Sequence, residues 1–274
     1  MDLDLRQRAM LREMGVTVWL PEAVPQPAVA VAAPSAALVP AATAAAWPDM
    51  AHRPGVPAPA PQAAVPVVAR IELPSDLAAA SWPALGQAVA ACQVCTLCQG
   101  RKNTVLGSGA VRADWLVVGD PPDEDEERAG IAFAGQAGQL LDNMLKAVGA
   151  SRGGEGRSGA YLTNIVKCRP TGGRNPEAAD LASCEAYLRR QVALVQPKVI
   201  LAMGRFAVQV LLQASLPDVA TRPLGKLRGA TYDYMGVPVI VTYHPKSLLR
   251  NLPDKAKAWA DLCRAMDLLA GTGG

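Results

Sequence analysis

Short apolar runs alternate with amphipathic segments along the C-terminal two thirds of the chain. The apolar runs predict buried strands, and the amphipathic segments predict helices. The strands are expected at 115–119, 161–166, 198–203 and 237–243, and the helices at about 75–91, 135–149, 178–195, 205–213 and 255–269. Strands that alternate with helices indicate a parallel sheet covered on both faces. We therefore expect an α/β fold, a three-layer α/β/α sandwich around a four-stranded parallel sheet.

The N-terminal third of the chain lacks the hydrophobic pattern expected of a folded core. Residues 1–21 can form a short helix followed by VTVWLP, a segment too small to fold alone, so it is either a frayed terminus or a peptide that docks on a partner. Its LREMGVTVWLP is similar to the N-terminal peptide by which the psi subunit of the bacterial replicative clamp loader attaches to its partner. Residues 22–72 are dominated by Pro and Ala and predict a disordered, semi-extended linker. The folded domain is expected at 73–274.

Composition narrows the class of protein. The net charge of +3 over 274 residues is too small to indicate a nucleic-acid binder by itself. The N-terminus is charged and has no apolar core segment, so we expect a cytoplasmic protein. Residues 28–47 are largely apolar, but they are mostly Ala and are interrupted by Pro34 and Pro40. We interpret this stretch as linker and expect no membrane span.

The cysteines suggest a metal site. In a reducing compartment clustered cysteines are expected to bind metal rather than to form disulfides. Cys92 and Cys95 form a C-x2-C pair, and Cys168 and Cys184 form a second, wider pair. Four thiolates suit zinc or an iron–sulfur cluster equally by count. The remaining cysteines are Cys98, a spare thiol beside the first pair, and Cys263, most simply a small core residue.

The stretch 161–184 brings chemistry to one edge of the predicted sheet. A buried strand there ends in a polar, Pro- and Gly-rich turn that carries Asn164 and Cys168. Ligands of open α/β sheets bind beyond the carboxyl ends of the strands. We therefore expect a functional site at this edge.

Four linked segments resemble the family-4, iron–sulfur uracil-DNA glycosylases over about residues 92–269. They are CQVCTLCQGR, WLVVGDPPDEDEERAGIAFAGQAGQLLDNML, YLTNIVKCRP and YHPKSLLR. The resemblance implies a parallel four-stranded sheet between helices. It also implies an enzyme that flips uracil out of DNA and hydrolyses the N-glycosidic bond of deoxyuridine, which initiates base excision repair. The family's cluster ligands fall on Cys92, Cys95, Cys168 and Cys184, so the resemblance implies a [4Fe-4S] cluster rather than zinc.

The resemblance also implies roles for three side chains. Uracil leaves as an anion, so the enzyme needs a donor aimed at the uracil oxygen where charge develops, and His244 matches the family's active-site histidine. Asn164 carries an amide that can accept from N3–H and donate to O4 of uracil. Phe133 corresponds to the ring that stacks on the flipped base. A structural histidine, an asparagine that caps its own turn and a core phenylalanine are the alternatives.

One loop departs from the family pattern. Where the family reads roughly G-E-[AG]-P-G, this chain has GDPPD, so Asp120 replaces a longer acid and Pro121 removes a backbone N–H beside the base pocket. We expect an acid of this loop, first Asp120 and then Glu126, to stabilise the cationic sugar or to orient water. Gly173 stands where the family commonly has Asn.

DNA contacts are expected away from the acidic run 123–127. Residues 223–264 hold seven Lys or Arg and three Asp, a basic stretch around His244. The start of the 135–149 helix offers backbone N–H groups to a phosphate through Gly135, Gln136 and Gly138. Just past His244, the superfamily inserts an apolar wedge into the base stack, and the matching residues are Leu248, Leu249 and Arg250.

Two other functions stay open at this stage. One is a DNA-binding or polymerase-associated module that keeps the four-thiolate cluster but has lost catalysis through its altered loop. The other is a glycosylase for a different deaminated base, such as hypoxanthine or xanthine. The favoured hypothesis is a uracil-DNA glycosylase that acts on uracil-containing DNA, associates with the nucleoid when on DNA, and is tethered through residues 1–21 to a clamp-loader or repair protein.

Overall fold

The structure is a computed structural model that describes residues 77–271. The predicted docking peptide, the linker and the first residues of the predicted domain lie outside this range, so those predictions are not tested here. Within it, a short turn at Leu77–Ala79 leads into helix α2 (Trp82–Ala91). Nowhere in residues 77–271 does a helix reach the length and apolar character that crossing a membrane requires.

A six-stranded sheet forms the centre of the domain, in the order β1-β3-β2-β4-β6-β5. Its four inner strands pair in parallel: β3 (Gly156–Asn164), β2 (Ala113–Gly119), β4 (Val199–Met203) and β6 (Val237–Thr242). The predicted four-stranded parallel sheet is thus confirmed. Antiparallel strands β1 (Ser108–Gly109) and β5 (Thr231–Tyr234) add one strand at each edge. The sequence did not predict them, because β1 has only two residues and β5 is polar.

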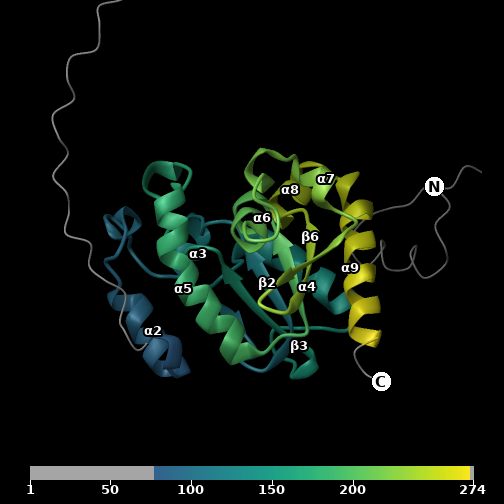
Figure 1. The fold of residues 1–274 in the computed structure, drawn as a ribbon, viewed down its shortest axis with the longest axis horizontal. Coiled ribbons are helices and arrows are strands. Elements are labelled where there is room, and N and C mark those ends of the chain that lie inside the picture. Colours follow the sequence, from purple (N-terminus) through teal and green to yellow (C-terminus); the bar gives the residue numbers. More distant parts are fainter. Residues whose placement is uncertain (1–76, 272–274) are drawn as a thin grey trace, which may run out of the picture. The chain divides into compact units, whose positions relative to one another are not determined.

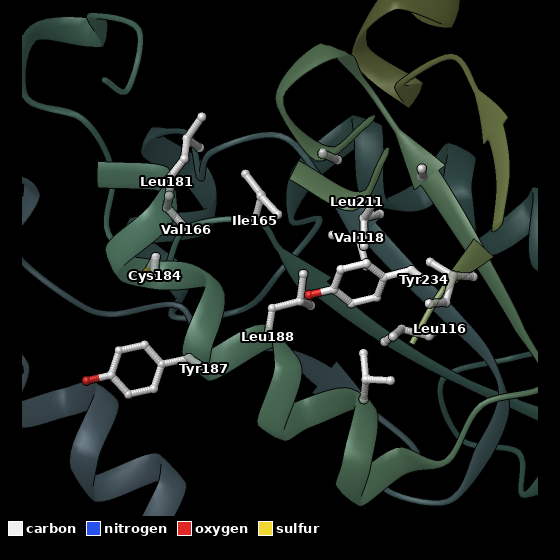
Figure 2. Close-up of a cluster of buried hydrophobic side chains, with 14 of the residues drawn as sticks. Leu116, Val118, Ile165, Val166, Leu181, Cys184, Tyr187, Leu188, Leu211 and Tyr234 are labelled. Carbon is white, nitrogen blue, oxygen red and sulfur yellow. The ribbon is translucent and has the colours of Figure 1, made fainter. Parts of the chain in front are cut away.

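Helices cover both faces of the sheet, which confirms the three-layer sandwich (Figure 1). Strand β2 is buried along its whole length, and its side chains alternate between two cores. Leu116 and Val118 join the core under α2, α5 (Ala178–Val195) and α6 (Arg205–Leu212), where Figure 2 shows them near Leu188 and Leu211. Trp115 and Val117 join the opposite core, under α4 (Gly135–Ala147), α8 (Pro245–Arg250) and α9 (Asp254–Gly271).

Four of the predicted helices match to within two residues, whereas the helix predicted at about 75–91 is a short turn at Leu77–Ala79 followed by α2 from Trp82. Three further helices were not predicted. The acidic run, interpreted from sequence as a loop, forms the short helix α3 (Glu124–Ala129). Asp123 and Glu126 close a reciprocal capping box that satisfies its first N–H groups. Helices α7 (Leu224–Leu227) and α8 were also not predicted, since neither is long enough to show a helical period.

The carboxyl ends of the four parallel strands meet at one edge of the sheet. Gly119 of β2 is in register with Asn164 of β3 on one side and with Met203 of β4 on the other. Met203 is in turn in register with Thr242 of β6. The loops that follow these residues therefore lie next to one another, as expected for a site in an open α/β sheet.

Gly138 of α4 gives a direct test of how the helix packs at this edge. A helical Gly→Ala change normally stabilises a protein by up to about 1 kcal/mol. Here a Cβ would overlap the carbonyl oxygen of Phe133, so we expect Gly138→Ala to lower the free energy of unfolding by about 1–3 kcal/mol. Urea denaturation measures it. The control is Gly153→Ala, where a Cβ meets open space, and a Gly138→Ala protein as stable as that control would contradict the packing.

Candidate active site and cysteine cluster

Phe133 lies at the centre of the edge where the strands end. Its ring covers Gly119, where any Cβ would overlap the ring. The ring also stacks on the imidazole of His244, with centroids 5.3 Å apart and planes inclined by 16°. The Phe133 backbone has φ = 53°, a left-handed conformation that is unusual for a bulky residue and that concentrates at functional sites.

Both backbone polar groups of Phe133, its N–H and its carbonyl, form hydrogen bonds to side chains. Its N–H donates to Glu126 Oε1 at 2.7 Å, and its carbonyl accepts from Arg152 Nη2 at 2.8 Å. Arg152 also donates to the carbonyl of Ala132 and to Ser108 Oγ, and it pairs with Asp142. Sequence reasoning missed Arg152, because an arginine in a Gly-rich turn carries no pattern that links it to Phe133.

Asn164 is 0 % exposed and lies on the same face of the sheet as Phe133. Its Nδ2 donates to the Asp120 carbonyl at 2.9 Å and to Glu126 Oε1 at 3.0 Å. Because both partners are acceptors, they fix which end of the amide is nitrogen. Asn164 Oδ1 is buried and has no partner among the described residues. A buried acceptor without a donor is rare in folded proteins and marks a position where a ligand can bind.

Glu126 is the shared anchor of these groups. Its carboxylate is 1 % exposed and accepts from the N–H groups of Phe133 and Asp123 and from the Asn164 amide. Lys246 of α8 pairs with Glu126 at 3.3 Å and with Asp123 at 2.6 Å. Glu126, the second candidate for the catalytic acid, thus has its oxygens occupied and orients its neighbours. Lys246 is a further residue that the sequence did not single out.

His244 caps the N-terminus of α8. Its Nδ1 accepts from the backbone N–H of Lys246 at 3.2 Å, which leaves the ring proton on Nε2. Burial lowers the pKa of His244 to about 3, and the nearby Lys246 ammonium also disfavours a second proton. At neutral pH the side chain is therefore a neutral imidazole that donates through Nε2.

Asp120 faces the other side of the sheet edge and caps α6. Its Oδ1 accepts from the backbone N–H groups of Phe206 at 2.7 Å and Ala207 at 3.3 Å. Burial raises the pKa of Asp120, whereas these N–H groups oppose the rise. Gly204 allows this contact, because its φ is 103° and a Cβ there would overlap the Asp120 carboxylate.

Two cavities open beside Asp120, which lines both of them. One, of about 370 Å³, is shared with His244 and the cations of Arg205, Lys246 and Arg250. The other, of about 500 Å³, is lined by both acidic and basic side chains, and Pro121 and Gly173 contribute to its wall. Phe133 thus stacks on His244 and is linked to Asn164 through Glu126, and Asp120 lies at the border between the two open cavities.

The candidate DNA-binding residues fall into two groups. Gly135 and Gln136 are exposed at the start of α4, and Leu249 (41 % exposed) and Arg250 are exposed on α8. Gly138 and Leu248 are buried in the core. The exposed positions can reach a DNA backbone or base stack, whereas the two buried residues contribute packing.

The four predicted metal-ligating cysteines converge between α2, the turn after β3 and the start of α5. Burial, with smaller contributions from the charges of Asp180, Cys168 and Cys92, raises the pKa of Cys95 to about 11. Burial likewise raises the pKa of Cys184 to about 12, and here Cys168 and Cys95 add to the rise. The four thiols are therefore close enough to influence one another's charge. Figure 2 shows Cys184 on the inner side of α5, near Val166.

Hydrogen-bond donors surround this cysteine set. Arg101 donates to Cys168 Sγ at 3.3 Å and to the Cys92 carbonyl at 2.7 Å, and the backbone N–H of Lys167 donates to Cys184 Sγ at 3.3 Å. Within residues 77–271, no group of three or more His, Cys, Asp or Glu side chains is arranged as around a bound metal ion. Four cysteine sulfurs, two of which accept N–H hydrogen bonds, are the kind of donor set that an iron–sulfur cluster uses.

The buried His244 predicts a specific pH dependence of stability. Its folded pKa, about 3, lies below the ordinary 6.5, so the unfolded chain binds a proton that the folded protein excludes as pH falls below 6.5. Between pH 6.5 and pH 5 this costs about 2 kcal/mol of unfolding free energy. Denaturant titrations of the wild type and His244→Gln should show that loss in the wild type only. A parallel pH dependence in both would contradict a buried neutral imidazole.

Comparison with known proteins identifies the family of this chain. The family described as the uracil DNA glycosylase superfamily matches residues 106–263. The type-4 uracil-DNA glycosylase of Saccharolobus solfataricus is 33 % identical over 183 residues, 65 % of this chain and 82 % of that protein. Those of Sulfurisphaera tokodaii (36 % over 167 residues, 60 % and 73 % of the two chains) and Thermotoga maritima (34 % over 168 residues, 61 % and 82 %) are also similar. The resemblance inferred from sequence is thereby confirmed: the chain belongs to the uracil-DNA glycosylase superfamily, in its type-4 family.

Proposed function

We propose that this chain is a uracil-DNA glycosylase that hydrolyses the N-glycosidic bond of deoxyuridine in DNA and so initiates base excision repair. The observation that carries the proposal is the buried, unpaired Oδ1 of Asn164. Uracil presents a donor at N3, whereas cytosine presents an acceptor there. The fixed Oδ1 can therefore accept a hydrogen bond from N3–H of uracil, whereas cytosine would leave this buried oxygen unpaired. A buried polar group left unpaired discriminates more strongly between ligands than a difference in size does.

The geometry narrows what Asn164 does. From the sequence we expected its amide to recognise both N3–H and O4. Both Nδ2 hydrogens are already used, by the Asp120 carbonyl and by Glu126. Asn164 thus recognises N3–H through Oδ1, and Glu126 acts by holding the amide in that orientation.

His244 supplies the donor for the leaving base. As the glycosidic bond breaks, negative charge builds up on a uracil carbonyl oxygen. The Nε2–H of a neutral imidazole, fixed by the Lys246 N–H on the opposite nitrogen, donates to that oxygen without prior loss of a proton. Phe133, which stacks on the His244 ring, supplies the aromatic face for the base.

Asp120 supplies a negative charge for the sugar. Its carboxylate is fixed by the first turn of α6 and borders the cavity that also contains His244. In that place it stabilises the cationic sugar or orients the attacking water. Asp120 can fill this role although its side chain is shorter than that of the Glu in the family pattern. Gly204 has no side chain, so the Asp120 carboxylate can lie directly against the end of β4.

Entry of the base requires movement at Phe133. Asn164 is fully buried and Phe133 is 2 % exposed, so a flipped base reaches Oδ1 only after the ring moves from its place over Gly119. Base extrusion from the duplex is a separate step. The exposed Leu249 on α8 is placed to fill the gap in the stack, and the Lys246 and Arg250 cations are placed to meet phosphate.

The cofactor in this proposal is a [4Fe-4S] cluster held by Cys92, Cys95, Cys168 and Cys184. With such a cluster bound, Cys92 and Cys95 after α2 would be held against Cys168 and Cys184, in the segment that follows Asn164. In solution the protein is expected in the cytoplasm, on DNA, with residues 1–21 as the segment that contacts a replication or repair protein.

The two principal roles predict the behaviour of single substitutions. Asn164→Ala and His244→Ala should each lower the rate of uracil excision by about 10²-fold or more, since each removes a hydrogen bond made to the reacting base. The measurement is uracil release from single- and double-stranded oligonucleotides, with hypoxanthine and xanthine as comparison bases. Full activity in either variant would refute its role. No release of uracil by the wild type, or faster release of another base, would refute the proposed substrate.

The cysteine assignment predicts which thiols hold iron. Cys184→Ser should lose iron and sulfide after anaerobic purification, because it removes a buried ligand that no other thiol replaces. Cys98→Ser should keep both, since Cys98 is the spare thiol. Iron analysis and the visible absorption spectrum decide this. Normal iron content in Cys184→Ser, or its loss in Cys98→Ser, would show that the ligand set is different.

A further inference from the structure

Lys167 is a buried cation that the proposed chemistry does not use. It lies in the turn after β3, next to Cys168, and is 1 % exposed. Its ammonium donates to Thr163 Oγ1 at 2.6 Å, to the Asn164 carbonyl at 2.8 Å and to Gln191 Oε1 at 2.7 Å. All three acceptors are neutral, and no carboxylate of the described residues forms an ion pair with it. A buried charge with no opposite charge nearby is strongly destabilising.

The opposite charges that face Lys167 belong to the cysteine set. Burial lowers the pKa of Lys167 to about 8, and Cys184 and Cys168 lie close enough for their charges to oppose that shift. The backbone N–H of Lys167 also donates to Cys184 Sγ at 3.3 Å. On the other side of the set, Arg101 donates to Cys168 Sγ. Two cations therefore flank the thiolates, Arg101 in a partly exposed position and Lys167 in the core.

The same ammonium contacts the base-recognition strand. Its bond to the Asn164 carbonyl fixes the backbone of the residue whose side-chain oxygen is unpaired, and its bond to Thr163 fixes the preceding residue. Gln191 of α5 completes the cage through its contacts with the Leu106 carbonyl and the Tyr161 hydroxyl. Lys167 thus bonds to the strand that bears Asn164 through its side chain and to the predicted cluster ligand Cys184 through its backbone N–H.

We propose that Lys167 is the buried counter-charge of the cysteine cluster and the positioning residue through which the cluster holds Asn164 in place. A cluster with four thiolates is an anion. Its negative charge stabilises the ammonium, whose direct hydrogen-bond partners are all neutral. Without the anion, no opposite charge among the described residues pairs with the ammonium, and the Asn164 carbonyl loses a stable partner. The second half of the inference rests on the proposed function, and the first half does not.

The test compares two substitutions at Lys167 with a matched surface control. Lys167→Met removes both the charge and the donor, whereas Lys167→Gln removes the charge and keeps a donor that is one atom shorter. Lys198→Met removes a half-exposed lysine that pairs with Asp114 at the amino-terminal ends of β4 and β2, the end of the sheet opposite to Lys167. The cluster's reduction potential is measured without DNA, together with iron content, circular dichroism and uracil excision in single turnovers.

The reduction potential tests the counter-charge, because net charge and hydrogen bonds to the sulfurs set the potential of such clusters. Loss of a nearby cation disfavours the reduced, more negative cluster, so both Lys167 variants should shift to more negative potentials while Lys198→Met stays at the wild-type value. A folded Lys167 variant that loses its iron, under conditions in which Lys198→Met keeps it, also supports the proposal. Wild-type iron content and potential in both Lys167 variants would overturn it.

Excision tests the link to Asn164. We expect kcat to fall about tenfold or more in Lys167→Met and less in Lys167→Gln, since misplacement of a recognition group costs rate steeply. Wild-type kcat in Lys167→Met would overturn the positioning role even if the potential shifts. Should the wild type itself release no uracil, the proposed function fails, while the potential still decides whether Lys167 is the counter-charge.

Discussion

The buried carboxylate of Glu126 is the interaction on which the rest of the site depends. It accepts from the Asn164 amide, from the Phe133 N–H and from the Asp123 N–H, and it pairs with Lys246. These partners come from the end of β3, the loop before α4, the capping box of α3 and the start of α8. A desolvated carboxylate is tolerated only when its oxygens are satisfied, so each partner is held to a narrow range of positions.

The sheet divides the work between its two faces. Gly119, Asn164, Phe133 and His244 lie on the side covered by α4, α8 and α9, where the base is expected to bind. The cysteines and the Asp120 cap lie toward α2, α5 and α6. Strand β3 connects the two sides, because it carries Asn164 at its end and leads directly into the turn with Lys167 and Cys168. A cluster bound on one side would therefore stabilise the segment that we propose recognises the base on the other.

Much of this architecture could be predicted from the sequence, because long apolar strands and amphipathic helices carry a clear period. The positions of Asn164 and His244 at the same end of the sheet followed from its parallel strands, although β2 and β4 lie between β3, which carries Asn164, and β6, which precedes His244. Short elements escaped prediction: α3 has only charged or small residues and is defined by its capping box, and β1 is too short to have a period. Asp120 and Glu126 were assigned from their charge and from the family pattern of this loop; in the structure Glu126 orients its neighbours and Asp120 caps α6.

Contacts between side chains that are far apart in the sequence could not be predicted from any local sequence pattern. Arg152 acts on Phe133 and Lys246 acts on Glu126 across long stretches of chain, and neither has a local motif that reveals its partner. Leu248 and Leu249 are adjacent in sequence, but only the geometry of α8 shows that the first is core and the second is exposed. Burial and partner identity depend on the folded arrangement, and they decide the role of each residue.

The most direct measurement is a crystal structure of the protein with an oligonucleotide that contains 2′-fluoro-deoxyuridine, whose glycosidic bond resists cleavage. The account predicts that N3 of the flipped uracil lies within hydrogen-bond distance of Asn164 Oδ1, that a uracil carbonyl oxygen accepts from His244 Nε2, and that the Phe133 ring covers the base. A base bound in another cavity, with Asn164 Oδ1 still unpaired, would contradict it.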